Sequence, residues 1–195
     1  MVTSHTVLSF NRVHDARELL VWYGIAWGIF VMAVAIIHFV PFRTAIVIIV
    51  LGGLALGLVS LLKPPQTSTD SARYAWDGIV AKSGRSPYNY VPSDSKLTQL
   101  RPDWLFPAVL HPEGNYPNAP LRCPGIEPTL TKDNGTGIPL CTEINRPQVH
   151  TIYPALAEMY FLLIEVISPP GGNYLPLQIA GLILSTGVTA LLLWG

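Results

Sequence analysis

Charged residues are nearly absent from two long stretches of this chain, and this distribution constrains its fold more than any other feature. Residues 19–62 hold one formally charged side chain, Arg43, and residues 151–195 hold two, Glu158 and Glu165. Only 12% of the 195 residues are charged, against about 25% in soluble domains. A membrane-spanning helix needs ~20 apolar residues. The pattern predicts an all-α integral membrane protein with about four transmembrane helices in the lipid bilayer.

The same distribution predicts how the chain is divided. The expected segments are a polar N-terminal segment (1–18), two transmembrane helices (19–62), a large polar loop (63–150) and two further transmembrane helices (151–195). The formal net charge is zero and the sequence has no run of basic residues, so nothing in it suggests nucleic acid as a partner.

Two glycines in the second apolar helix are spaced for close packing. Gly53 and Gly57 form a GxxxG motif, which allows two helix backbones to approach each other in a membrane. The motif alone does not identify the partner helix.

The polar loop, residues 63–150, has the composition of an ordered, loop-rich cap. It contains most of the chain's 18 prolines, which resist long helices and sheets. It is also too rich in Trp, Tyr and Leu for a plain disordered linker. We expect one or two short helices within it.

One of these short helices can be placed from its ends. Ser68 or Thr69 can cap its start, and Gly84 can stop it after about Ser83. Four polar or aromatic residues then fall on one face of this amphipathic helix, namely Asp70, Arg73, Tyr74 and Asp77. The spacing predicts an interfacial helix that presents a polar stripe.

Cys123 and Cys141 both lie in the polar loop. A disulfide between them would place the loop on an oxidising, extracytoplasmic face of the plasma membrane; the alternative is two unrelated thiols. Prolines and glycines flank both cysteines, which favours the disulfide as a tether. We therefore expect a multi-pass protein with loop 63–150 outside and Arg43 inside, although Arg12 and Arg17 favour a cytoplasmic N-terminus.

Two carboxylates on the short helix are candidates for chemistry. Asp70 stands just beyond the membrane exit, where it could act as a general base or simply complement the helix dipole. Asp77 could be a second reactive carboxylate or the i+4 partner of Arg73, and the pairing is the favoured interpretation.

A second group of candidates precedes the third apolar segment. Arg146, His150 and Tyr153 lie close together in the sequence, and arginine matches phosphate bidentately. Arg85 and Arg101 are also possible phosphate ligands, but the favoured interpretation of both is a solvated loop arginine. The sequence has no paired His/Cys spacing typical of a metal site.

Aromatic residues are numerous around the short helix. Tyr74 and Trp76 could stack on a sugar ring, but aromatic residues also gather at membrane interfaces without any ligand.

Three motifs carry a resemblance to a known family. They are TSTDSARYAWDGIVAKSGRSPYNY at 67–90, LR with WLFP within 100–107, and INRPQVHTIYPALAEMYF at 144–161. Their order resembles the GT-C class of polytopic glycosyltransferases, specifically the actinobacterial polyprenol-phosphate-mannose-dependent mannosyltransferases that include the glycosyltransferase 87 family. Ala155 replaces the second proline of that group's Y-P-P motif.

The resemblance implies an inverting transferase that moves mannose from a polyprenyl-phosphate donor to a glycolipid or lipoglycan acceptor. It implies Asp70 as the catalytic base and a polyprenyl-phosphate sugar as the donor substrate, and the sequence assigns no cofactor. The residues expected to bind substrate are Arg73, Tyr74, Trp76, Asp77, Arg146, His150 and Tyr153. Enzymes of this class have more transmembrane helices than the four expected here, so the sequence resembles their N-terminal module. The alternative is a non-catalytic membrane subunit whose loop docks onto a larger membrane complex.

Overall fold

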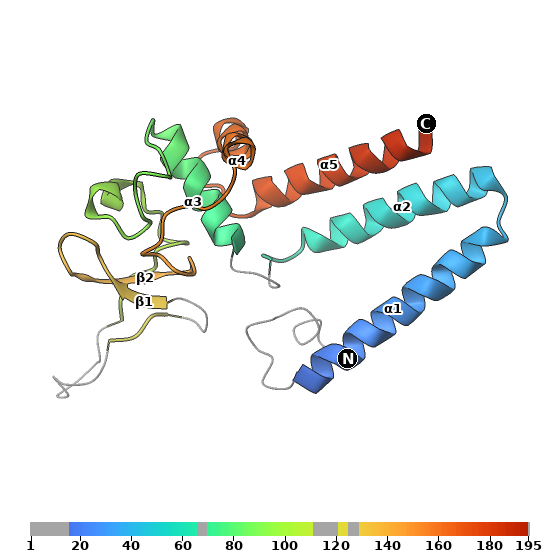
Figure 1. Cartoon of the computed structure of the whole chain (residues 1–195), viewed down its shortest axis with the longest axis horizontal. Coiled ribbons are helices and arrows are strands. Elements are labelled where there is room, and N and C mark those ends of the chain that lie inside the picture. The colour runs from blue at the N-terminus through green and yellow to red at the C-terminus, as the bar shows by residue number, and fades with distance from the viewer. Residues whose placement is uncertain (1–15, 66–69, 111–120, 125–128, 195) are drawn as a thin grey trace. The chain divides into compact units, whose positions relative to one another are not determined.

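The computed structural model describes residues 16–65, 70–110, 121–124 and 129–194. Its elements, in chain order, are α1 (Ala16–His38), α2 (Phe42–Ser60), α3 (Asp70–Lys82), the 3-10 helix η2 (Ser95–Leu100), β1 (Thr129–Lys132), β2 (Pro139–Thr142), α4 (Ala155–Ile167) and α5 (Leu175–Trp194) (Figure 1). They form two compact units. One contains α1, α2 and α5 from Gln178 onward, and the other contains the elements from α3 through the first turn of α5.

Three helices are long and apolar enough to cross a membrane: Leu20–His38 within α1, Phe42–Ser60 and Leu175–Trp194. Their large apolar side chains are mostly exposed, as expected when lipid rather than protein surrounds them. The prediction of a largely helical membrane protein is confirmed at this level. Pro41 lies between α1 and α2 with a φ of −53° and directly precedes the first residue of α2.

Gly57 brings α2 and α5 close together. A Cβ atom at this position would collide with the side chain of Leu182 on α5, whereas Gly53 has open space around it. Nearby, the Gln178 Nε2 donates to the carbonyl oxygens of Ser60 at 2.9 Å and Lys63 at 2.8 Å. The Ser60 carbonyl is one of those at the C-terminus of α2 that lack a partner within the helix. One glycine of the predicted motif therefore lies at a helix contact.

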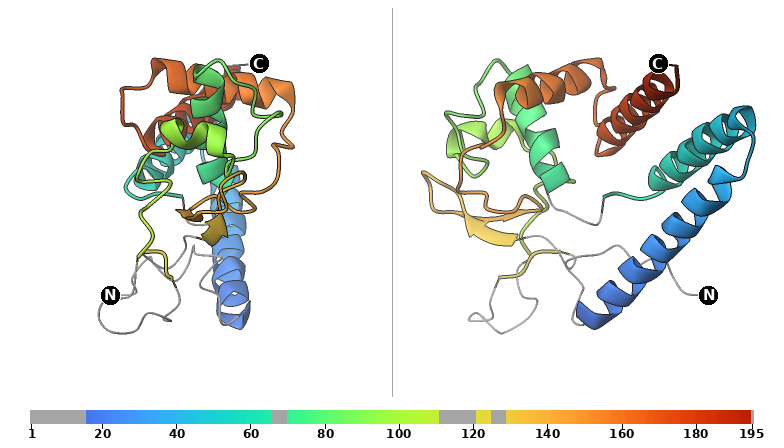
Figure 2. Two further views of the ribbon diagram at one scale, coloured as in Figure 1. Left: turned by 90° about the vertical axis from the view of Figure 1, so that its left-hand side faces the viewer. Right: turned by 45° about the vertical axis from the view of Figure 1, so that its right-hand side comes forward.

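The fourth expected span is not confirmed, because the segment that should form it is a much shorter helix. α4 has 13 residues, or about 20 Å of helix, whereas the hydrocarbon core is about 30 Å thick. Pro154 precedes its first residue, and residues 168–173 end it with the sequence SPPGGN. α4 packs against α3 (Figures 1 and 2).

The short helix is present where the sequence predicts it, but its polar face is not exposed. α3 runs from Asp70 to Lys82, and Gly84 beyond its end has a φ of +80°. The proposed cap residues, Ser68 and Thr69, lie outside the described residues. Arg73 is only 5% exposed and Asp77 only 1%. The expectation of an interfacial helix with an exposed polar stripe is therefore wrong, because α4 covers this side of α3.

A second side of α3 contributes to the core of the same unit. Ala72, Trp76 and Val80 recur every four residues and are all buried. They pack with residues from the segments that follow, namely Leu97, Leu105, Phe106, Ile144 and Tyr174. α3 is thus buried on two sides, and this arrangement fixes its orientation within the unit.

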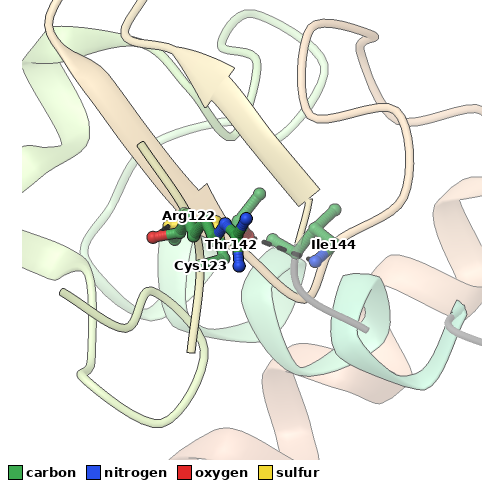
Figure 3. The surroundings of a disulfide bond; sticks show 5 residues. Arg122, Cys123, Thr142 and Ile144 are labelled. Carbon is green, nitrogen blue, oxygen red and sulfur yellow. Dashed lines mark hydrogen bonds between the residues drawn. A yellow bond between two sulfur atoms is a disulfide. The ribbon is translucent and has the colours of Figure 1, made fainter. Parts of the chain in front are cut away.

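A β-hairpin, which composition did not predict, carries the disulfide. β1 and β2 pair antiparallel, with Leu130 opposite Cys141. The turn between them uses Gly135 and Gly137, both at positive φ. Cys123 is bonded to Cys141, with the two Cα atoms 5.6 Å apart (Figure 3), so the expected disulfide is present. The side of the membrane on which it lies stays a prediction.

Candidate functional site

One cavity brings together residues that lie far apart in the sequence. It has a volume of about 440 Å³ and lies between the start of α3 and residues 145–153, the segment that leads into α4. Its lining is Asp70, Arg73, Asn145, Arg146, Val149, His150, Thr151, Ile152 and Tyr153. Five of these are residues that the sequence singled out: Asp70, Arg73, Arg146, His150 and Tyr153.

Asp70 is the first residue of α3 and is partly exposed. Its Oδ1 accepts a hydrogen bond of 3.0 Å from the Nδ2 of Asn145. This contact ties the start of the helix to the segment that forms the opposite wall. Because the amide donates to the carboxylate, it restricts the rotation of the side chain and orients it within the cavity.

Arg73 links Asp77 on its own helix to Val149 in the segment 145–153. Its Nε lies 3.0 Å and 3.1 Å from the two carboxylate oxygens of Asp77, and its Nη1 donates to the carbonyl oxygen of Val149 at 2.9 Å. The favoured pairing of Arg73 with Asp77 is confirmed. The Nη2 of Arg73 is buried and has no hydrogen-bond partner among the described residues. A guanidinium group of this kind favours an anion nearby, because one of its buried donors is unsatisfied.

A buried acidic cluster lies behind Arg73. The Thr151 Oγ1 donates to the Glu158 Oε1 at 2.8 Å, and the Glu158 Oε2 is buried with no hydrogen-bond partner in the described part of the chain. Burial raises the pKa of Asp77 to about 7; the charge of Glu158 adds to this rise, and Arg73 opposes it. Asp77 and Glu158 are both buried, so a proton bound to Asp77 compensates part of their negative charge up to about neutral pH.

Several contacts hold the segment 145–153 in place. Two are the bonds from Asn145 to Asp70 and from Arg73 to Val149 described above. In addition, Ser93 donates to the Pro147 carbonyl through its backbone N–H at 3.1 Å and its hydroxyl at 2.9 Å. The Gln148 Nε2 donates to the Lys132 carbonyl at 2.6 Å.

Arg146 and His150 are exposed residues of this segment. Arg146 has a φ of 49°, a left-handed conformation that is uncommon for residues other than glycine. Its carbonyl accepts the Val149 backbone N–H at 3.0 Å and so closes a turn. Strained backbone of this kind clusters at functional sites, and here it occurs at Arg146, which lines the cavity together with His150.

The predicted aromatic residues fall into two classes. Tyr153 lines the cavity, its carbonyl accepts the Tyr88 hydroxyl at 2.6 Å, and burial raises the pKa of its phenol. Tyr74 packs between the helices, stacked on Phe161 with ring centroids 4.7 Å apart and edge-on to Tyr153 at 5.0 Å. Trp76 is 1% exposed and belongs to the core. Of the three, only Tyr153 lines the cavity.

The two arginines interpreted as solvated differ. Arg85 is exposed and donates to the Lys96 carbonyl at 2.5 Å. Arg101 forms an ion pair of 2.9 Å with Asp133, and both side chains are less than one-tenth exposed. The interpretation of Arg101 as solvated is therefore wrong, since the β1–β2 turn covers it.

Among the residues that the structure describes, no cluster of three or more His, Cys, Asp or Glu side chains could hold a metal ion. Comparison of the chain with protein-family models, curated proteins and solved structures finds no match. The cavity and its residues are therefore the basis for inferring function.

Proposed function

We propose that this protein is a membrane glycosyltransferase module that transfers a mannosyl residue from a polyprenyl-phosphate donor to a glycolipid or lipoglycan acceptor. In this proposal the reaction takes place in the cavity between α3 and residues 145–153. The disulfide supports an extracytoplasmic location, because such bonds persist in oxidising compartments. The three apolar helices support a multi-pass protein of the plasma membrane.

One observation carries the proposal: a carboxylate, an exposed arginine, an exposed histidine and a buried guanidinium group line the same cavity. Asp70 comes from α3, whereas Arg146 and His150 come from a segment about 75 positions later. The lining also includes Val149 and the highly exposed Ile152. A cavity with both charged and apolar walls fits a substrate that has a phosphate and an attached lipid.

The proposed reaction is a single displacement. Asp70 accepts the proton of an acceptor hydroxyl, and the resulting oxygen nucleophile attacks the anomeric carbon of the donor sugar. The bond between that carbon and the phosphate oxygen breaks, and the polyprenyl phosphate leaves with the electron pair. Attack from the face opposite the leaving group inverts the configuration. A positioned general base typically contributes about 10²–10⁴-fold to the rate.

Positive charge in the cavity would stabilise the leaving phosphate. Arg146 and His150 are exposed and can approach it, and the unsatisfied Nη2 of Arg73 adds a buried donor. Asp77 holds the Arg73 guanidinium through Nε, so we assign Asp77 as a positioning residue. The phenol of Tyr153 keeps its proton, because burial raises its pKa, and can donate a hydrogen bond to the sugar.

The test is the transfer of labelled mannose from polyprenyl-phosphate mannose to membrane glycolipid, in membranes that contain the protein. Asp70→Asn should reduce transfer by about 10²-fold or more, because the amide cannot accept the proton. The matched control is Asp103→Asn, an exposed residue outside the cavity lining, which should leave transfer unchanged.

Equal transfer by wild type and Asp70→Asn would remove Asp70 from the mechanism. If inserted, disulfide-bonded wild-type protein gave no transfer from this donor, the enzyme proposal would fail in favour of a non-catalytic subunit that docks onto a larger membrane complex.

A further inference from the structure

α4 has one face that no described part of the protein covers. Leu156, Met159 and Leu163 are spaced three and four residues apart, so they form one stripe along the helix, and each is between 57% and 79% exposed. Val166 and Ile167 extend the stripe by one more turn and are exposed as well. A contiguous exposed apolar surface of this kind marks a site of interaction with another molecule.

The face of α4 opposite this stripe packs against α3 and fixes the rotation of α4 about its own axis. Glu158, Phe161 and Ile164 are buried, and a Cβ atom on Gly78 of α3 would lie only 2.7 Å from the Phe161 carbonyl oxygen. The backbones of α3 and α4 are therefore in close contact. Rotating α4 to hide the stripe would expose Glu158 and Phe161, so the stripe faces outward as long as the unit stays folded.

The charges of α4 lie away from the stripe. Glu158 is buried and hydrogen-bonded to Thr151, and the Glu165 carboxylate lies 3.2 Å from the Lys82 ammonium of α3. No Asp, Glu, Lys or Arg interrupts the stripe between Leu156 and Ile167. The outer face of α4 therefore carries no charge, while its other face packs against protein. Such an outer face is suited to hydrocarbon rather than to water.

The position of α4 in the chain indicates what covers the stripe. Residues 168–174 join it directly to α5, one of the three helices that can cross a membrane. The first turn of α5, including Pro176 and Leu177, belongs to the same compact unit as α4, and both residues line a small crevice with Phe161 and Ile164. The first turn of a membrane-spanning helix is thus held against α4, so α4 lies at the point where the chain enters the membrane.

We propose that α4 is an interfacial helix, with its stripe of Leu156, Met159 and Leu163 inserted among the lipids next to the entry point of α5. At about 20 Å of helix it is too short to span the hydrocarbon core. A helix in the plane of the interface buries its apolar face about 5–10 Å into the boundary between headgroups and acyl chains. The partner of this surface is the bilayer itself, independent of any enzymatic activity.

The test is depth-dependent quenching in phosphatidylcholine vesicles that contain the full chain. An environment-sensitive fluorophore is attached to single cysteines introduced as Leu156→Cys, Met159→Cys or Leu163→Cys; the native cysteines stay in their disulfide. Quenching is measured with lipids that carry a nitroxide near the headgroup or near the end of the acyl chain. Leu184→Cys, in the middle of α5, and Gln99→Cys, exposed on η2, serve as deep and aqueous controls.

All three stripe positions should show blue-shifted emission and should be quenched about twofold or more strongly by the shallow nitroxide than by the deep one. Their depths should be equal, because the helix lies in the plane of the membrane. A depth that increases steadily from Leu156 to Leu163 would overturn the proposal in favour of an inserted helix. Absence of lipid quenching would also overturn it, since water or another protein would then cover the stripe.

Discussion

α4 and α5 come from one apolar stretch of the sequence, yet they have different environments. α5 has 20 residues and none of them is buried, whereas α4 has 13 residues and buries Glu158, Phe161 and Ile164 against α3. Both helices are apolar, so hydrophobicity alone does not separate them. Two properties separate them: the length of the helix and the carboxylate of Glu158. A buried glutamate needs protein partners, which lipid cannot supply.

The largest effect should come from removing the charge that holds the α3–α4 contact together. In Arg73→Met, Asp77 stays buried near the charge of Glu158 without the cation that it pairs with. Removing one partner of a buried pair costs about 3–5 kcal/mol. Urea unfolding of the full chain in detergent should show this loss. Arg85→Met is the matched control at an exposed site and should change the free energy of unfolding little; equal losses in both variants would contradict the assigned role of Arg73.

Glycine substitutions compare the two helices directly. In Gly78→Ala the new Cβ would meet the Phe161 carbonyl oxygen of α4 at 2.7 Å, and such overpacking costs about 1–3 kcal/mol. In Gly181→Ala on α5 the new Cβ has open space around it. That substitution should be neutral or stabilising, because alanine favours helix by up to about 1 kcal/mol over glycine. Thermal unfolding of both variants measures the difference, and the reverse order would show that α3 and α4 are not in close contact.

The α3–α4 contact should also depend on pH. Because the pKa of Asp77 is raised from 3.8 to about 7 in the folded protein, the folded state binds this proton more tightly than the unfolded state does. Stability from this group is therefore fully present below about pH 4 and is lost as the pH rises to about 7. In Asp77→Asn this fall should flatten, as measured by melting temperature across that range. An unchanged slope would assign the titration to another group.

The smallest effect should come from the exposed end of the same helix pair. The Lys82 ammonium lies 3.2 Å from Glu165 and donates to its carbonyl oxygen at 2.8 Å. Since both side chains are partly in water, Lys82→Gln should cost only about 0.2–1 kcal/mol in urea unfolding. Salt should weaken the wild type by a similar amount. A loss as large as that of Arg73→Met would mean that charge, rather than burial, decides how firmly α4 is held.

The sequence predicted the ends of α3 and the pairing of Arg73 with Asp77, because both follow from local helix geometry. It also predicted several residues that line the cavity, such as Asp70 and His150, although their roles stay a prediction. It could not predict that α3 is buried on two sides, because periodicity does not reveal which element covers a polar face. Trp76 was accordingly assigned to substrate, whereas it lies in the core.

Two further features of the structure were not predicted from the sequence, each for a specific reason. The partner of Glu158 could not be predicted from the sequence of the apolar stretch, since Thr151 lies outside the helix and the contact is tertiary. The β-hairpin was missed because proline-rich composition disfavours strands. Pro139, however, is the first residue of β2, a position where proline's missing N–H is tolerated.

The contacts that hold the segment 145–153 in place also affect the thermodynamics of ligand binding. Fixing the backbone of a flexible loop costs about 1–2 kcal/mol per residue, and a ligand that has to order such a loop loses that amount from its affinity. Here hydrogen bonds to Asp70, Ser93, Lys132 and Arg73 already hold the segment in the folded protein. A ligand that enters the cavity therefore does not have to order this segment. Less of its binding free energy is then lost as conformational entropy of the protein.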